Sequence, residues 1–327
     1  MKKNILYIAH GSQDFCDDGV FCGLRYFLDL YSIDYKLSGC QFHGEEQSTI
    51  ELRHQISYYL FKDDWFKTAS MLGKYDGSKK YDLIILGSSW IQNQETFNNV
   101  KHSLADNGKV VVIYGVDNLN DVHISIKHDY IFYTNAINPD WENGNIIPFV
   151  CPNDLLNDDS KTISYLLNCQ MGPTHPKRND TINFVYNTMN ELNLLDSSKI
   201  SLHNLSQTLL GHTNMTPFSD WWDTLKNSKI IISERGTGQE TFRFWEAVAT
   251  GNIVLCSPET TYNQNNVPLP PNVFIWSDYE DLKNKIIEFS KLSDEEVINN
   301  RVNVKEFLKK HHTPKTRVAK ILKNIQF

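Results

Sequence analysis

The residues best suited to chemistry lie close together in the second half of the chain, between Ile230 and Leu255. An apolar strand runs into a loop that contains Gly236 and Gly238, and a helix is expected to begin near Gln239. Such a junction directs backbone N–H groups at an anion, and glycine allows the loop to approach it closely. The pattern predicts a phosphate-binding loop, although a short glycine loop before a helix is also an ordinary turn.

Charged side chains accompany this loop and suggest what it binds. Arg235 and Arg243 carry forked guanidinium donors that suit a diphosphate. Glu246 follows on the helix, where its carboxylate can accept hydrogen bonds from the two hydroxyls of a ribose. Thr241 lies at the junction of loop and helix. The expected donor-binding residues therefore include all of these, and Glu246 must be reachable by a ligand rather than packed in the interior.

The segment Ser233–Glu246 follows the pattern S-x-R-G-x-G-x-[DE]-T-x-R-x-W-E. It resembles the donor-site motif of GT-B glycosyltransferases, and most of all that of the exostosin-like and CgeB-like groups. A looser similarity, confined to the Arg-x-Trp-Glu core and the segments around it, extends to phage DNA β-glucosyltransferases. The resemblance implies two Rossmann-like doubly wound domains that face each other across a cleft. Glu234 departs from the family pattern, which has a proline at this position.

The chain of 327 residues is long enough for two domains. Apolar runs that alternate with helical patterns predict α/β domains with parallel sheets. A linker near Pro148–Asp159 divides the chain into an acceptor-side domain, residues 1–155, and a nucleotide-sugar-binding domain, residues 156–312. Residues 313–327 are expected to form a helix that returns to the first domain, although its basic face is also compatible with a membrane surface.

The net charge of −7 argues against broad attraction to nucleic acid or anionic lipid, without excluding a local basic patch. The six cysteines are scattered, which predicts buried thiols in a reducing compartment. The first apolar run is too short for a signal peptide, and no run approaches the length of a membrane span. We therefore expect a cytoplasmic protein without a membrane span.

A second group of candidates lies after the predicted strands of each domain. Arg178 begins the first helix of the second domain, and the resemblance implies that it contacts a phosphate; a solvated basic turn is the alternative. Asp117 follows the predicted strand Lys109–Val116, where the phage enzymes place their catalytic aspartate, but it also suits a simple turn. Asp18, after the first strand, is the rival general base. A helix is predicted over Gln94–Asp106.

Two aromatic positions have both a structural and a functional interpretation. Trp90 follows a buried strand and is expected to pack against the domain, with stacking on a sugar as the alternative. His10 follows the first strand and is expected to line the floor of the cleft as a structural hydrogen-bonding group, with a catalytic role as the alternative. The Trp221–Trp222 pair is expected to pack in the core.

The chain contains no Asp-x-Asp motif, so neither a metal nor another cofactor is expected beside the nucleotide sugar. A glutamate eight residues before Glu246, typical of retaining enzymes, is also absent, which favours inversion. The prediction is a hexosyltransferase-type enzyme that moves a sugar from a nucleoside-diphosphate donor, expected to be UDP-linked, to the hydroxyl of a carbohydrate or other acceptor. The alternatives are an epimerase or hydrolase of the same fold and a non-catalytic nucleotide-sugar-binding module.

Overall fold

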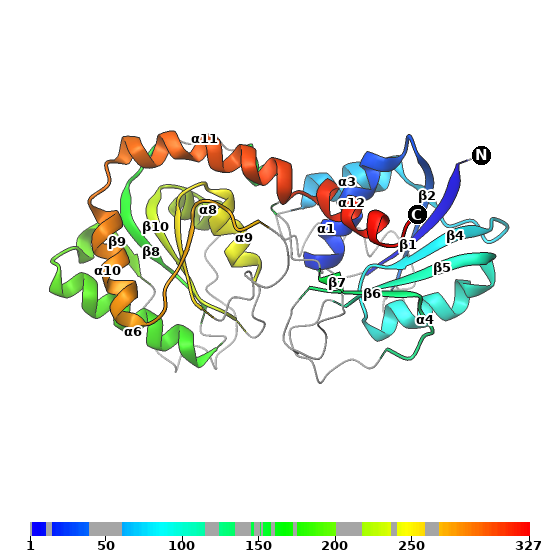
Figure 1. Cartoon of the computed structure of the whole chain (residues 1–327), viewed down its shortest axis with the longest axis horizontal. Coiled ribbons are helices and arrows are strands. Elements are labelled where there is room, and N and C mark those ends of the chain that lie inside the picture. Colours follow the sequence, from blue (N-terminus) through cyan, green and yellow to red (C-terminus); the bar gives the residue numbers. More distant parts are fainter. Residues whose placement is uncertain are drawn as a thin grey trace. The chain divides into compact units, whose positions relative to one another are not determined.

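The computed structural model describes most of the chain: residues 2–10, 15–38, 61–114, 124–134, 145–146, 151, 153–157, 161–172, 175–200, 218–236, 241–258 and 268–327. The chain divides into two compact units. The first comprises residues 1–154 and 312–327, and the second comprises residues 155–311. Each unit is built on a parallel β-sheet with helices on both of its faces (Figure 1).

The sheet of the first unit has seven strands in the order β3-β2-β1-β4-β5-β6-β7. These are β1 (Lys3–Ala9), β2 (Tyr31–Leu37), β3 (Gly73–Lys74), β4 (Tyr81–Leu86), β5 (Leu104–Tyr114), β6 (Tyr130–Tyr133) and β7 (Asn145–Ile146). The chain first adds strands on one side of β1 and then returns to add β4 on the other side. The sheet therefore has a topological switch point at the carboxyl ends of β1 and β4, where open α/β sheets bind ligands.

Helices cover both faces of this sheet. They are α1 (Phe15–Leu24), α3 (Lys62–Met71), α4 (Ile91–Val100) and α12 (Pro314–Asn324), with the short α5 (Asn153–Leu156) at the boundary of the unit. Alternate residues of β1 face opposite sides, as the pleat of a strand requires. Leu6 and Ile8 pack in one cluster with Phe97 of α4, whereas the Tyr7 ring lies 5.7 Å from that of Phe21 in α1. In Figure 1, α1, α3 and α12 lie on the face opposite α4.

The last helix of the chain, α12, packs on α1 within the first unit. Gly23 of α1 makes this approach possible, because a β-carbon at this position would collide with the carbonyl oxygen of Pro314 and with Val318. Arg317 of α12 is buried and has Nη2 3.1 Å from Nδ1 of His312. Arg317, one of the basic residues of α12, therefore faces the interior of the unit and not the solvent.

The helix predicted over Gln94–Asp106 is wrong at its carboxyl end. The α-helix α4 stops at Val100, a 3-10 turn follows at Lys101–Ser103, and β5 begins at Leu104. Leu104 pairs with Tyr81 of β4, and a register shift separates this pair from the rest of the ladder. Residues 104–106 therefore form a strand despite their helical sequence pattern, because they pair with the neighbouring part of the sheet.

The second unit has a five-stranded parallel sheet in the order β12-β11-β10-β8-β9. Its strands are β8 (Tyr165–Cys169), β9 (Ser198–Ile200), β10 (Ser228–Ser233), β11 (Ile253–Cys256) and β12 (Val273–Ile275). Its helices are α6 (Pro176–Glu191), α8 (Phe218–Lys226), α9 (Phe242–Ala249), α10 (Tyr279–Ser290) and α11 (Asp294–His311). The order places a switch point at the carboxyl ends of β8 and β10.

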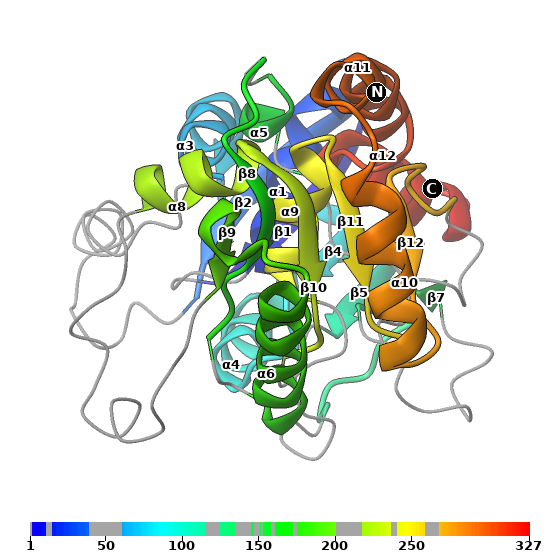
Figure 2. The same ribbon diagram turned by 90° about the vertical axis from the view of Figure 1, so that its left-hand side faces the viewer.

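The central strand β10 is held from both faces of its sheet. Ile230 and Ile232 pack in one hydrophobic cluster with Ile182 of α6 and Ile286 of α10. Figure 2 shows α6 and α10 in front of this sheet, with α8 and α9 behind it. A strand buried on both faces gives the loop that follows it a rigid base.

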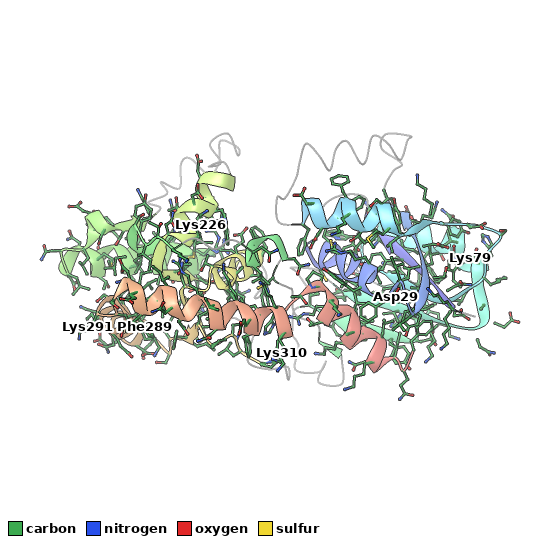
Figure 3. The ribbon with its side chains drawn as sticks, turned by 90° about the horizontal axis from the view of Figure 1, so that it is seen from above. Asp29, Lys79, Lys226, Phe289, Lys291 and Lys310 are labelled. Atoms are coloured by element: carbon green, nitrogen blue, oxygen red, sulfur yellow. The ribbon has the colours of Figure 1, made fainter. Side chains whose placement is uncertain are left out.

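The carboxyl end of α8 is also fixed. The carbonyl of Lys226, labelled in Figure 3, accepts hydrogen bonds from Asn252 Nδ2 and Arg301 Nη2, both at 3.0 Å. Asn252 in turn accepts from Arg301 Nε at 2.7 Å. These bonds connect α8 and α11 to the turn that precedes β11. None of the described helices is long and apolar enough to cross a membrane.

Candidate functional site

The switch point of the second unit brings together two loops that are far apart in the sequence. Residues 170–172 follow β8, and residues 234–236 follow β10, the strand that pairs with β8. The first turns of α6 and α9 continue from the same edge of the sheet. Helix amino termini and strand carboxyl ends therefore meet here, as in the sites where α/β proteins bind anionic ligands.

Arg178, in the first turn of α6, ties these two loops together. Its guanidinium donates to the carbonyls of Arg235 (Nε, 2.8 Å), Gly172 (Nη1, 3.1 Å) and Glu234 (Nη2, 3.4 Å). The side chain is buried, at 5% exposure. Burial, with a further contribution from the neighbouring Arg243, lowers the pKa of Arg178 to about 10. Several of its donors are thus used to shape the site rather than to bind a ligand directly.

Arg243, in the first turn of α9, brings a second guanidinium to the same edge. Its Nη1 donates to the carbonyl of Gln170, and its guanidinium carbon lies 4.4 Å from the centre of the Trp221 ring. Burial lowers the pKa of Arg243, although Glu246 opposes this shift. Arg178 and Arg243 are close enough to repel one another. A bound anion would relieve this repulsion, which makes the pair suited to a phosphate group.

Glu246 lies one helical turn after Arg243 and is nearly shut off from water, at 3% exposure. Its Oε2 accepts a hydrogen bond of 3.2 Å from Nε1 of Trp221. Burial raises the pKa of Glu246, while Arg243 and the Trp221 hydrogen bond counteract the rise. This burial contradicts the expectation that a ligand can reach Glu246, because Trp221 and the packing of α9 enclose the carboxylate in this structure. Its setting is polar, however, and glutamates are rarely buried without such partners.

The carboxylate of Glu234 is turned into the unit, where it braces the loop. Oε1 accepts the backbone N–H of Arg235 at 2.9 Å, and Oε2 accepts the hydroxyl of Thr181 at 3.0 Å. The side chain is 4% exposed. This geometry explains how an acid can stand at the position where the motif that the sequence resembles has a proline. Proline would fix the backbone through its ring, whereas the Glu234 carboxylate accepts one hydrogen bond from the backbone and a second from the side chain of Thr181 in α6.

Gly236 lies against the guanidinium of Arg178. A β-carbon at this position would be 3.0 Å from Arg178 Nη2 and 3.2 Å from Thr241 Cγ2. Thr241 caps α9: its hydroxyl accepts the N–H of Phe244 at 3.3 Å, so the helix begins at Phe242. Gly238, also expected in the site, lies outside the described residues.

Trp221 is a member of this cluster that the sequence did not identify. The sequence predicts core packing for both tryptophans of α8, and Trp222 is indeed buried, at 7% exposure. Trp221 instead contacts Glu246 with its indole N–H and Arg243 with its ring face. A separation of 25 residues between Trp221 and Glu246 gives no periodic signal. Only the fold brings them together.

Of the two candidates for the general base in the first unit, the structure describes Asp18 but not Asp117. Asp117 lies outside the described residues. Asp18 is in the first turn of α1 and is buried, at 5% exposure. Its neighbour Asp17 accepts hydrogen bonds from the hydroxyl of Tyr7 at 2.6 Å and from the backbone N–H of His10 at 2.8 Å. Across the described part of the chain, no cluster of three or more His, Cys, Asp or Glu side chains could hold a metal ion.

No family model matches the sequence, and no curated protein matches it. Two solved glycosyltransferase structures are similar to the whole chain. An α-glucosyltransferase in complex with UDP and a 13-mer DNA containing a central A:G mismatch has a TM-score of 0.53 and 10% identity, and the match covers 100% of both chains. A glycosyltransferase from Rickettsia africae has a TM-score of 0.51 and 13% identity, and covers 99% of this chain and 98% of its own. The predicted GT-B fold, with two Rossmann-like units, is confirmed. The assignment to the exostosin-like and CgeB-like groups stays a prediction.

Proposed function

We propose that the protein is a glycosyltransferase that takes a UDP-linked sugar and transfers the sugar to an acceptor hydroxyl. One observation carries the proposal: the buried Arg178 and Glu246 and the half-buried Arg243 are gathered at the switch point of the second unit. Charged groups are rarely buried together unless they serve structure or a ligand. The fold supports the same conclusion, because both similar structures are glycosyltransferases and one holds UDP.

Within this proposal, four charged side chains have separate roles in binding the nucleotide. Arg243 and Arg235 bind the diphosphate, assisted by the backbone at the start of α9, and Arg178 holds the two loops in the geometry that these contacts need. Negative charge grows on the departing UDP during the transfer. Fixed positive groups in a water-poor site stabilise that charge better than water does. Glu246 accepts hydrogen bonds from the ribose hydroxyls.

The acceptor is activated by a carboxylate of the first unit, with Asp117 as the proposed general base and Asp18 as the alternative. The base removes the proton of the acceptor hydroxyl as its oxygen attacks the anomeric carbon and UDP departs. A single displacement of this kind inverts the configuration at that carbon. Metal independence is part of the proposal and rests on the lack of an Asp-x-Asp motif in the sequence. The cationic side chains at the donor site would then stabilise the negative charge on the diphosphate, as a metal ion does in metal-dependent enzymes.

A thermal-shift panel of UDP-, GDP-, CMP- and dTDP-sugars tests the donor assignment. A ligand that binds only the folded state raises the melting temperature. UDP-sugars should raise it in the wild type and in the control Lys291→Ala, which removes an exposed lysine at the carboxyl end of α10, but not in Arg243→Ala. The proposal fails if no nucleotide sugar raises the melting temperature, or if Arg243→Ala responds as the wild type does.

Turnover separates the transferase from its alternatives. Release of UDP should require an acceptor and should persist in EDTA. Conversion of UDP-sugar in the absence of acceptor would identify an epimerase or hydrolase instead. Binding of UDP without release, against a panel of acceptors, would identify a binding module. The Glu246→Ala variant should raise the KM for the donor strongly while the protein stays folded.

A further inference from the structure

The switch point of the first unit displays an exposed tryptophan. Trp90 follows β4 and directly precedes α4, and it is 41% exposed. The next residue, Ile91, is 60% exposed. Large apolar side chains next to one another at a surface are characteristic of binding sites. Their position at the carboxyl edge of an open α/β sheet is where such sheets bind ligands.

The backbone beside Trp90 is held by buried hydrogen bonds. Asn93 Nδ2 donates to the carbonyl and the hydroxyl of Ser88, at 3.2 and 3.1 Å. Gln94 Nε2 donates to the carbonyl of Ser89 at 2.8 Å. The backbone carbonyl of Trp90 also accepts the N–H groups of Asn93 and Gln94. An aromatic side chain on so fixed a backbone is preorganised for a ligand, since little freedom is lost on binding.

The neighbouring strand end completes this edge. The rings of His10 and Trp90 have their centres 6.0 Å apart. His10 follows β1, and Asp17 fixes its backbone by accepting its N–H. Gly87, at the end of β4, leaves the room that Asp17 needs, because a β-carbon there would collide with the Asp17 carboxylate. His10 and Trp90 therefore lie in the segments that follow the two strands flanking the switch point.

Ser89 adds a polar group to the same edge. Its hydroxyl oxygen is buried, and within the described part of the chain it has no hydrogen-bond partner. Buried polar atoms nearly always have a partner, so such an atom calls for a ligand or a water molecule. Ser89 immediately precedes Trp90, so the hydroxyl and the indole belong to one short segment.

We infer that the carboxyl edge of β1 and β4 in the first unit is a carbohydrate-binding site in which a sugar ring stacks on Trp90. A sugar presents an apolar face of C–H groups and a rim of hydroxyls, which match an indole face beside a serine hydroxyl. The acids Asp17 and Asp18 lie in the helix that starts at this edge. Nucleic acid requires lysine and arginine to neutralise its phosphates, so these acids favour an uncharged sugar. The inference rests on the proposed function and identifies the acceptor as a carbohydrate.

Saturation-transfer NMR of the full chain in the presence of UDP tests this site. The probes are the methyl glycosides of glucose, galactose, mannose and N-acetylglucosamine, and, separately, a single-stranded 13-mer DNA. At least one glycoside should receive saturation on its ring protons. The Trp90→Ala variant should weaken that binding about tenfold or more, as expected for a central aromatic contact. Trp90→Phe, which retains an aromatic face, should weaken it less.

Leu30→Ala is the matched control, because Leu30 is 62% exposed but precedes β2, at the opposite edge of the same sheet. Glycoside binding should be unchanged in this variant. The inference is overturned if the wild type contacts no glycoside, if Trp90→Ala contacts one equally well, or if Trp90 is needed for DNA alone. Calorimetry with UDP on the same samples tests the proposed function separately. UDP binding without glycoside contact defeats only the inference, and glycoside contact without UDP binding defeats only the donor assignment.

Discussion

Nε1 of Trp221 donates a hydrogen bond of 3.2 Å to Oε2 of Glu246, and the same indole ring lies under the guanidinium of Arg243. One side chain of α8 therefore orients both Glu246 and Arg243 of α9, the two residues proposed to hold the nucleotide. An indole N–H can only donate, so it favours the ionised form of Glu246. We therefore propose Trp221 as a positioning residue of the proposed donor site.

Trp221→Phe should weaken UDP binding about tenfold or more, because a hydrogen bond to a charged group contributes about 1.5–3 kcal/mol. The phenyl ring keeps a face for Arg243, so the loss reports the N–H group. Calorimetry with UDP measures the change. Trp222→Phe is the control, since Trp222 is its buried neighbour on α8, and its UDP affinity should equal that of the wild type. Equal affinities of Trp221→Phe and the wild type would contradict the positioning role.

Acidification should weaken UDP binding through the protonation of Glu246. Burial raises the pKa of this carboxyl, so it takes up a proton at a higher pH than an ordinary glutamate does. A protonated Glu246 loses part of its capacity to accept hydrogen bonds from a ribose diol. The UDP dissociation constant, measured by calorimetry at a series of pH values, should increase as the pH falls through this raised pKa. In Trp221→Phe the increase should begin at a higher pH. An unchanged profile in Glu246→Gln would show that another group titrates.

The same pKa shift predicts a pH-dependent stability difference between the wild type and Glu246→Gln. Below the unfolded-state pKa, both states hold the proton and the carboxyl adds no pH dependence. As the pH rises, the unfolded chain ionises first, so the wild type loses stability until the higher folded-state pKa is passed. The free energy of unfolding of Glu246→Gln, relative to that of the wild type, should therefore increase across this window. Urea titrations at several pH values measure it, and a difference that does not change with pH would contradict the shift.

How far the sequence could predict this site depends on how local each contact is. The loop around Gly236 and the position of Arg243 follow from neighbours within a few residues, so their pattern was visible in the chain. Arg178 was expected at a phosphate, yet three of its hydrogen bonds go to carbonyls of two loops. A sequence does not specify which acceptor a guanidinium finds. The role of Trp221 arises only when α8 and α9 pack on the same face of the sheet.

Glu234 and Thr181 should be energetically coupled. The Thr181 hydroxyl donates to Oε2 of Glu234 at 3.0 Å, and both side chains are buried. Residues that share a buried hydrogen bond show interaction energies of about 0.5–3 kcal/mol in double-mutant cycles. Unfolding in urea of Glu234→Ala, Thr181→Val and the double variant measures the coupling. Thr188→Val, at another buried position of α6, provides the control cycle and should be additive with Glu234→Ala. Additive effects in the Thr181 cycle would show that the acid does not brace the loop through α6.

Gly236→Ala should weaken UDP binding more than Gly172→Ala does. A β-carbon at Gly236 would lie 3.0 Å from Nη2 of Arg178 and 3.2 Å from Cγ2 of Thr241, so the loop or the guanidinium must move. At Gly172 the same β-carbon meets no atom within 4 Å. Both glycines lie at the switch point, which makes Gly172→Ala a matched control for the added methyl group. Calorimetry with UDP should show a clear loss of affinity for Gly236→Ala and little change for Gly172→Ala, with both variants folded by circular dichroism. If the two variants bound UDP equally well, the close fit of this loop around Arg178 would have no part in nucleotide binding.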